Sequence, residues 1–220
     1  MRLVLLSLVL VTGCHRAAEP TAVPAARSKP TSDASPAALG TLAPGTGVPV
    51  GERVPDVRAK DLEGRDVALA DLYARGPVLL VFYRGGWCPF CNFQIRALPE
   101  GAGQFTARGI TLAAVSVDRP DEGARTRALY ALPFPVLSDP DLAFVEGFHV
   151  ANRVGEAELA RLKAFGMDLE ASSGRQHRVI AIPSMFLIDR GGVVRWAHSD
   201  PDYKTRPSVA QILAALDALR

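Results

Sequence analysis

Two cysteines separated by two residues form the part of the sequence best suited to chemistry. They lie in Cys88-Pro89-Phe90-Cys91, directly after the apolar run 78–83 and the turn 84–86. Proline is favoured at the first position of a helix, where its missing N–H costs nothing. The motif therefore places Cys88 at a helix N-cap and Cys91 one turn later on the same side. This spacing predicts two thiols that can form a disulfide.

The predicted helix start assigns a role to each sulfur. A thiol at an N-cap lies near the free N–H groups of the first turn and the positive end of the helix dipole. We therefore expect the pKa of Cys88 to fall below that of a free thiol, which makes Cys88 the predicted nucleophile. Cys91, deeper in the helix, is placed to attack an oxidised Cys88 and close the disulfide. Arg84 is a candidate to stabilise the thiolate, the alternative being a solvated surface charge.

Two structural interpretations of the cysteine pair compete with the redox one. A structural disulfide is disfavoured because closing so small a loop removes little chain entropy. A zinc site would need two further ligands at suitable spacing, and the four histidines are isolated in the sequence. We therefore interpret the pair as redox-active and predict no bound metal and no cofactor.

The surrounding pattern predicts one α/β domain. Apolar runs at 78–83, 110–117 and 185–188 are typical of strands buried on both faces. The turn 189–192 before the apolar run 193–196 indicates an antiparallel hairpin. Strands that alternate with helices predict a central mixed sheet flanked by helices, with one helical insertion near 153–179, a helix and a polar loop. The expected helices are 88–98, 121–131, 141–150, 156–165 and 208–219.

The first 47 residues have the composition of an export signal and a tether. Residues 1–13 contain a nine-residue apolar run, too short to span a membrane as a helix. Val11-Thr12-Gly13-Cys14 resembles a lipobox, in which Cys14 becomes lipidated; a plain secretory signal is the alternative. Residues 14–47, rich in Ala and Pro, are expected to be a disordered tether before a domain at 48–220.

This N-terminal pattern predicts a location in the bacterial cell envelope. We expect contact with the membrane through the lipid anchor only, and an outer-membrane, periplasmic position because His15 follows the lipidated cysteine. The formal net charge of +2, with no stripe of Lys or Arg, excludes nucleic acid as a partner.

Several segments resemble the AhpC/TSA redoxins, the peroxiredoxin-like members of the thioredoxin superfamily. The resemblance covers 48–220 and is carried by 50–56, 61–69 and 81–91, then by 182–189 and the tail 196–207. It implies a thioredoxin-like fold in which Pro183 faces Cys88. It also implies a cis peptide at Pro183 that turns the Ile182 carbonyl toward a substrate.

The resemblance implies a thiol-dependent peroxidase, in which Cys88 becomes a sulfenic acid and then a disulfide with Cys91. The partners would be a peroxide and an external dithiol reductant such as a thioredoxin-like protein. The site departs from the family in two places. Typical peroxiredoxins carry Thr or Ser three residues before the peroxidatic cysteine, here Gly85, and Arg three residues before the Phe of the 182–189 strand, here Pro183.

Two other functions remain open from the sequence. The first is a thiol–disulfide oxidoreductase that acts on disulfides of envelope proteins through a mixed disulfide at Cys88. The second is a copper-binding or copper-delivery protein that uses both thiolates and His177, since soft thiolates suit Cu(I).

Overall fold

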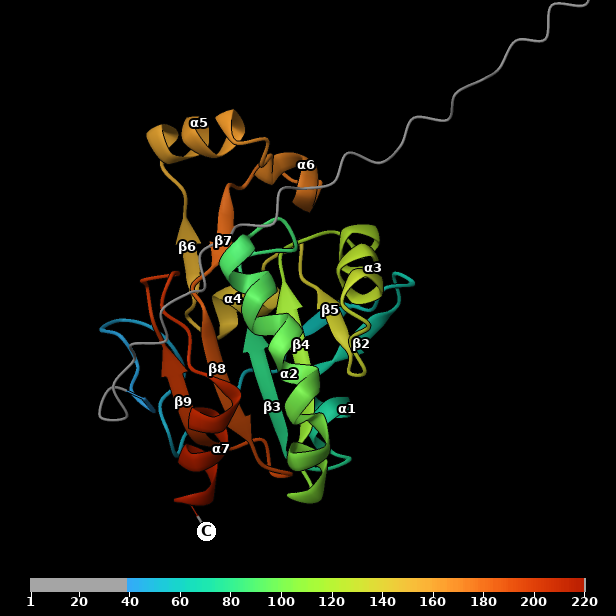
Figure 1. The fold of residues 1–220 in the computed structure, drawn as a ribbon, viewed down its shortest axis with the longest axis vertical. Coiled ribbons are helices and arrows are strands. Elements are labelled where there is room, and N and C mark those ends of the chain that lie inside the picture. The colour runs from blue at the N-terminus through green and yellow to red at the C-terminus, as the bar shows by residue number, and fades with distance from the viewer. Residues whose placement is uncertain (1–38, 220) are drawn as a thin grey trace, which may run out of the picture.

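A seven-stranded mixed sheet forms the centre of the computed structural model, which describes residues 39–219 (Figure 1). The strand order is β2-β1-β5-β4-β3-β8-β9, and β6 pairs with β7 in a separate two-stranded sheet. The bounds are β1 Arg58–Lys60, β2 Asp66–Ala68, β3 Val78–Phe82, β4 Thr111–Ser116, β5 Val136–Ser138, β6 Ala151–Arg153, β7 Val179–Ala181, β8 Ser184–Ile188 and β9 Val194–Ser199.

The strand pairing confirms the predicted mixed sheet. β3 and β4 run parallel, as do β4 and β5, whereas β8 is antiparallel to both β3 and β9. The β8–β9 turn is the predicted hairpin, where the Asp189 carboxylate accepts the N–H groups of Gly191 at 2.8 Å and Val193 at 2.9 Å.

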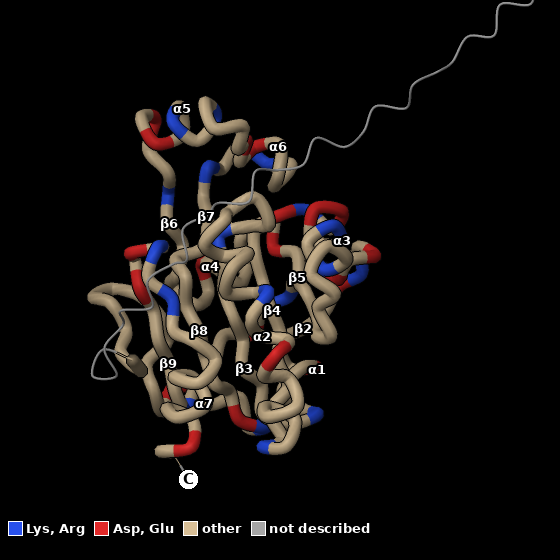
Figure 2. Tube along the Cα trace, in the orientation of Figure 1, with Lys and Arg blue, Asp and Glu red and all other residues tan. Residues whose placement is uncertain are grey.

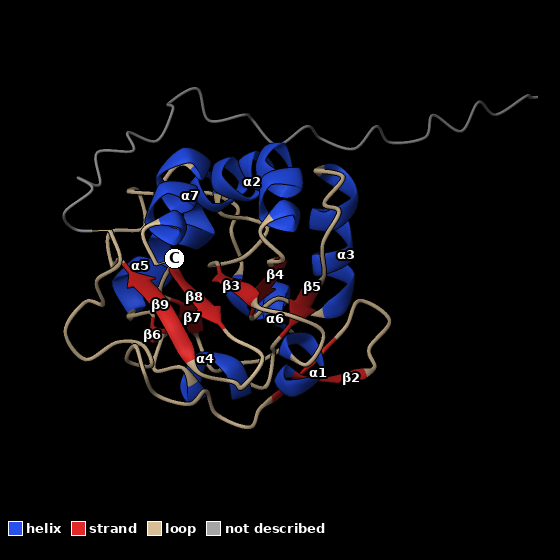
Figure 3. Cartoon of the chain, turned by 90° about the horizontal axis from the view of Figure 1, so that it is seen from below, coloured by secondary structure: helices blue, strands red, loops and turns tan. Residues whose placement is uncertain are grey.

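Helices cover both faces of the sheet (Figure 3). α2, α3 and α7 lie on one face, and α1 and α4 lie on the other. The predicted helix 88–98 is longer than expected, because α2 continues through Pro99 to Ala107. The bounds are α1 Leu69–Tyr73, α2 Pro89–Ala107, α3 Pro120–Leu129, α4 Ala143–Gly147, α5 Glu156–Ala164, α6 Leu169–Ser173 and α7 Val209–Asp217.

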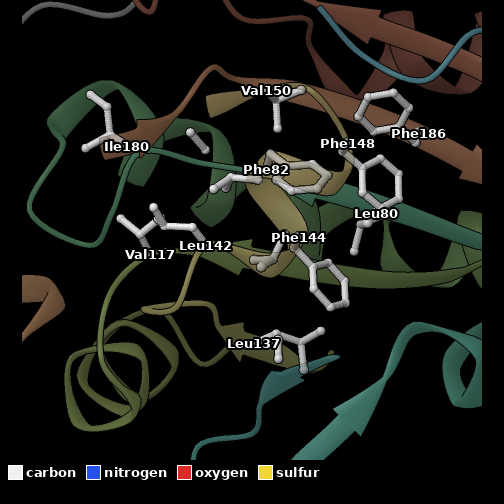
Figure 4. Close-up of a cluster of buried hydrophobic side chains, with 14 of the residues drawn as sticks. Leu80, Phe82, Val117, Leu137, Leu142, Phe144, Phe148, Val150, Ile180 and Phe186 are labelled. Atoms are coloured by element: carbon white, nitrogen blue, oxygen red, sulfur yellow. The ribbon is translucent and has the colours of Figure 1, made fainter. Parts of the chain in front are cut away.

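The central strand β3 is buried on both sides, as its continuous apolar sequence predicts. Leu79 and Val81 pack with residues of α2 and α7, whereas Leu80 and Phe82 pack into the opposite cluster. That second cluster is built on aromatic rings (Figure 4), with Phe148 in ring contact with Phe82 at a centroid distance of 5.1 Å. Successive side chains of β3 therefore point to opposite faces of the sheet, and this one strand contributes to both hydrophobic clusters.

The predicted insertion contains two helices rather than one helix and a polar loop. β6 and β7 lead to α5 and α6, which lie beyond the end of the main sheet (Figure 1). The prediction of a loop was wrong because Asp168 caps α6, accepting the N–H groups of Glu170 and Ala171 at 3.0 Å each. Gly174 ends this helix with a φ of 66°.

Residues 39–47 do not belong to the predicted tether. Leu39 and Leu42 pack against the core, and the Ser199 N–H of β9 donates to the Thr41 carbonyl at 3.0 Å. Apolar burial and backbone pairing thus hold a segment whose composition indicated disorder. The predicted signal peptide, Cys14 and the rest of the predicted tether lie outside the described residues. Among the helices of 39–219, none is long and apolar enough to cross a membrane.

Replacing Phe148 by Ala should lower the free energy of unfolding by about 3–5 kcal/mol, since the change leaves a cavity among three aromatic neighbours. Urea denaturation of the variant measures this loss. The matched control is Phe165→Ala, because Phe165 is 73% exposed. That control should stay within about 0.5 kcal/mol of the parent, and equal losses in both variants would contradict the assigned core.

Candidate active site

The cysteine motif lies where β3 ends and α2 begins. Pro89 occupies the first turn of α2, and Cys88 is the N-cap, as predicted. The Cys88 N–H donates to the Gly85 carbonyl at 3.1 Å, and the Asn92 N–H donates to the Cys88 carbonyl at 3.0 Å. The turn and the first helical turn are therefore one hydrogen-bonded unit that fixes both sulfurs.

Both cysteines are free thiols and almost fully buried, with exposed fractions of 1% for Cys88 and 0% for Cys91. The Cys91 sulfur accepts the backbone N–H of Arg84 at 3.4 Å and the guanidinium of Arg206 at 3.6 Å. It is also hydrogen-bonded to Cys88. Donors from the turn before α2, from the α2 N-cap and from Arg206, which is distant in sequence, therefore converge on one sulfur.

These donors place the negative charge on Cys91. Burial alone would raise the pKa of Cys91, but the hydrogen bond from Cys88 and the charge of Arg206 outweigh it and lower the pKa to about 5. The hydrogen bond to Cys91, together with burial, raises the pKa of Cys88 instead. The structure differs from the expected lowering at Cys88, because the N–H and guanidinium donors reach the sulfur of Cys91.

Arg84 is a buried cation rather than the solvated surface charge considered as its alternative. It is 4% exposed, and its guanidinium lies 4.0 Å from the ring centroid of Tyr203 and 5.3 Å from that of Trp87. It also donates to the Glu158 carboxylate of α5 at 3.3 Å. Its charge opposes the rise in the pKa of Cys88, in line with the predicted role.

The peptide bond before Pro183 differs from the one that the family resemblance predicts. No cis peptide bond occurs between residues 39 and 219, so the predicted cis peptide at Pro183 is wrong. The Ile182 carbonyl accepts the hydroxyl of Ser184 at 2.9 Å, and the Pro183 carbonyl accepts the N–H of Asp200 at 3.1 Å. The Ser184 hydroxyl therefore takes one of the two hydrogen bonds that the Ile182 carbonyl, which was expected to face a substrate, can accept.

The two departures from the peroxiredoxin pattern have a structural reading. A Cβ atom at Gly85, where φ is 149°, would lie 2.2 Å from the Trp87 Nε1 atom, so Thr or Ser cannot replace it without rearrangement. If Cys91 is the reactive sulfur, Cys88 takes the position three residues before it, where typical peroxiredoxins carry Thr or Ser. Arg206 would then provide the guanidinium that these proteins carry at the position of Pro183. Sequence spacing could not reveal Arg206, which lies 115 residues from Cys91.

A groove of about 860 Å³ runs between α2 and α7 and reaches Arg206. Its walls combine apolar side chains, such as Leu98 and Leu213, with the half-exposed ring of Phe93. The groove therefore leads from the surface to a residue that contacts the Cys91 sulfur.

The copper hypothesis finds no ligand set in the described part of the chain. His177 lies in the insertion, where its Nδ1 accepts the N–H of Val179 at 2.9 Å and its Nε2 lies 3.2 Å from the Pro140 carbonyl. No group of three His, Cys, Asp or Glu side chains between 39 and 219 is arranged to hold a metal ion.

Comparison with known proteins gives a family and two kinds of relative. The model of the AhpC/TSA family matches residues 50–197. A proposed peroxiredoxin of Mycobacterium tuberculosis (strain H37Rv) is 35% identical over 91 residues, which cover 41% of this chain and 57% of that protein. The thiol-disulfide oxidoreductase ResA of Bacillus thuringiensis subsp. konkukian is 27% identical over 146 residues, 66% of each chain. The chain thus spans less than two thirds of these relatives.

Solved structures agree on the fold. The peroxidoxin BcpB of Mycobacterium tuberculosis superimposes with a TM-score of 0.60 at 21% identity, covering 78% of this chain and 97% of that one. Reduced Prx3 of Vibrio vulnificus, in complex with H₂O₂, gives a TM-score of 0.63 at 19% identity, covering 77% and 99%. The predicted thioredoxin-like fold is confirmed.

Replacing Arg206 by Met should raise the pKa of Cys91 by about one to two pH units, because a hydrogen bond to a charged group contributes about 1.5–3 kcal/mol. Ultraviolet absorbance of the thiolate, followed against pH, measures this change. The full chain would carry Cys14→Ser, so that only the two thiols of the motif titrate.

Arg195→Met is the control for loss of one positive charge, since Arg195 pairs with Asp189 on the surface. It should leave the titration unchanged. A pKa that stays the same in Arg206→Met would show that the guanidinium does not hold the thiolate.

Proposed function

Because the chain belongs to the AhpC/TSA family, we propose that it is a thiol-dependent peroxidase that reduces H₂O₂ or organic hydroperoxides. The observation that carries this proposal is the Cys91 sulfur held by two donors, the Arg84 N–H and the Arg206 guanidinium. Preorganised donors of this kind stabilise charge in a transition state. The hydrogen-bonded Cys88 thiol is in place to complete the reaction.

In the first step the thiolate attacks the O–O bond of the peroxide. A sulfur–oxygen bond forms, the O–O bond breaks, and the leaving oxygen takes up a proton to become water or an alcohol. The sulfur is oxidised to a sulfenic acid. The Arg206 guanidinium lies beside this sulfur, where it can bind the peroxide oxygens as negative charge moves onto them.

In the second step the other cysteine attacks the sulfenic acid. A disulfide forms and water leaves, and an external dithiol then reduces the disulfide by exchange. The described structure corresponds to the dithiol form. Since both sulfurs are buried, the peroxide and the reductant need a local opening of the loop that carries Tyr203 or of the groove at Arg206.

The electrostatics support Cys91 as the attacking sulfur and Cys88 as the resolving one, the reverse of the roles expected from the sequence. We therefore expect Cys91→Ser to lose the rapid reaction with H₂O₂. Cys88→Ser should keep one rapid turnover and stop at a sulfenic acid that a dimedone probe traps. Stopped-flow fluorescence of the reduced full chain, with Cys14→Ser in every variant, measures the rates.

The comparison between the two variants decides the roles. A rapid phase kept by Cys91→Ser and lost by Cys88→Ser would restore Cys88 as the nucleophile. A parent rate less than about 10²-fold above that of a free thiol, smaller than the effect of one preorganised donor, would contradict the peroxidase proposal itself.

A thiol–disulfide oxidoreductase is the second candidate function. The relative that matches 66% of this chain carries that name. The half-exposed rings of Trp87 and Phe90 beside the motif also suit contact with a protein substrate. Rapid exchange with a protein disulfide, at a peroxide rate no better than that of a free thiol, would favour this candidate.

We also propose that the domain is held at the bacterial envelope by lipid on Cys14, on the strength of the lipobox-like Val11–Cys14. In a bacterial host the parent chain should incorporate labelled palmitate and fractionate with membranes. Cys14→Ser should lose the label while keeping the thiol chemistry of the motif. Label incorporated equally by the variant would exclude Cys14 as the anchor.

A further inference from the structure

A buried carboxyl group beside the cysteine turn has no part in the reaction described above. Asp118 follows β4 and is 1% exposed. Its Oδ2 atom accepts the N–H of Gly86 at 2.7 Å and the hydroxyl of Ser116 at 3.1 Å. Its Oδ1 atom is buried without a hydrogen-bond partner among the described residues. An unpaired oxygen in a buried site penalises the charged form of the carboxyl group.

Asp118 and Cys91 both accept backbone hydrogen bonds from the turn 84–86. Gly86 donates its N–H to the carboxyl group, and Arg84, two residues earlier, donates its N–H to the Cys91 sulfur. The free Oδ1 atom lies over the turn, 2.8 Å from the place that a Gly85 Cβ atom would take. A change of charge on either group therefore acts on the other across one short stretch of backbone.

The groups that face Asp118 favour its protonated form. Burial, helped by the charges of Glu122 on α3 and of Cys91 and opposed by the hydrogen bonds of the carboxyl group, raises the pKa of Asp118 to about 7. The buried Tyr83 hydroxyl also responds to both Asp118 and Cys91, each of which raises its pKa. The nearby Arg119 guanidinium is bonded to Asp121, Glu122 and the Ala171 carbonyl.

We propose that Asp118 is the proton acceptor of the cysteine pair: it binds a proton when the disulfide is reduced and a thiolate forms on Cys91, and releases that proton when the disulfide forms again. The proposal rests on the proposed redox function of the pair. It makes Asp118 a positioning and proton-binding residue that acts through the turn, without contact with the peroxide.

The reaction balances with Asp118 included. An external dithiol gives two electrons and two protons to the disulfide and becomes a disulfide itself. The products in the site are the Cys88 thiol and the Cys91 thiolate, so one of the two protons has no place on sulfur. The Asp118 carboxylate takes this proton, and like-charge repulsion between carboxylate and thiolate drives the transfer. When the peroxide consumes the thiolate, Asp118 releases this proton to solvent, and the leaving oxygen of the peroxide takes up one proton from solvent, so the count of protons closes.

Carbon-13 NMR of the full chain labelled at aspartate carboxyls tests the proposal, with Cys14→Ser to leave two thiols. The Asp118 signal, assigned by its loss in Asp118→Asn, should titrate near pH 7 in the dithiol form and at a lower pH in the disulfide form. Asp139 is an internal control, because burial also raises its pKa to about 7 while its carboxylate bonds to the N–H groups of α4. Its titration should be equal in both forms.

A proton count gives a second, independent result. In weak buffer between about pH 6 and pH 7, above the pKa of Cys91, a dithiol should release about one proton per chain on reducing Asp118→Asn and fewer on reducing the parent. Asn keeps an oxygen for the Gly86 N–H, so the turn is retained. Equal proton release, or one Asp118 titration in both redox forms, would overturn the proposal. The disulfide is made with diamide, so a protein inactive toward peroxide can still show the coupling.

Discussion

The hydrogen bonds to the Cys91 sulfur join the turn between β3 and α2 to the segment before α7, which is distant in the sequence. The Arg84 N–H comes from the end of β3, the sulfur from α2, and the Arg206 guanidinium from the segment before α7. A thiolate in a site without water needs such donors, because burial alone would keep the proton on sulfur. The central strand must therefore end at one fixed point, and α7 must pack close against α2.

Gly101 allows α2 and α7 to pack closely against each other. A Cβ atom at Gly101 of α2 would lie 2.4 Å from a methyl carbon of Val209 in α7. Beyond this contact, Arg108 and Asp217 form an ion pair at 2.6 Å near the ends of the two helices. The packing of α7 against α2 therefore fixes the segment that carries Arg206.

The sequence predicted what long apolar runs and turn residues determine. The strand at 78–82, the hairpin at 189–192 and the N-cap position of Cys88 follow from local pattern and are as expected. β1, β2, β5, β6 and β7 have three residues each, too few for a period to appear, and tertiary pairing alone defines them. The contact of Arg206 with Cys91 could not be predicted for a similar reason, because the two residues are far apart in sequence and meet only through tertiary packing.

Charged residues gather on the insertion and on α3 (Figure 2), and one carboxylate of α5 reaches inward to the site. Glu158 is the anion bonded to Arg84, whose guanidinium lies against the rings of Trp87 and Tyr203. The ion pair between Glu158 and Arg84 therefore connects α5 of the insertion to the cysteine site. Removing the insertion would also remove the carboxylate partner of Arg84, and so would change the electrostatic environment of the two cysteines.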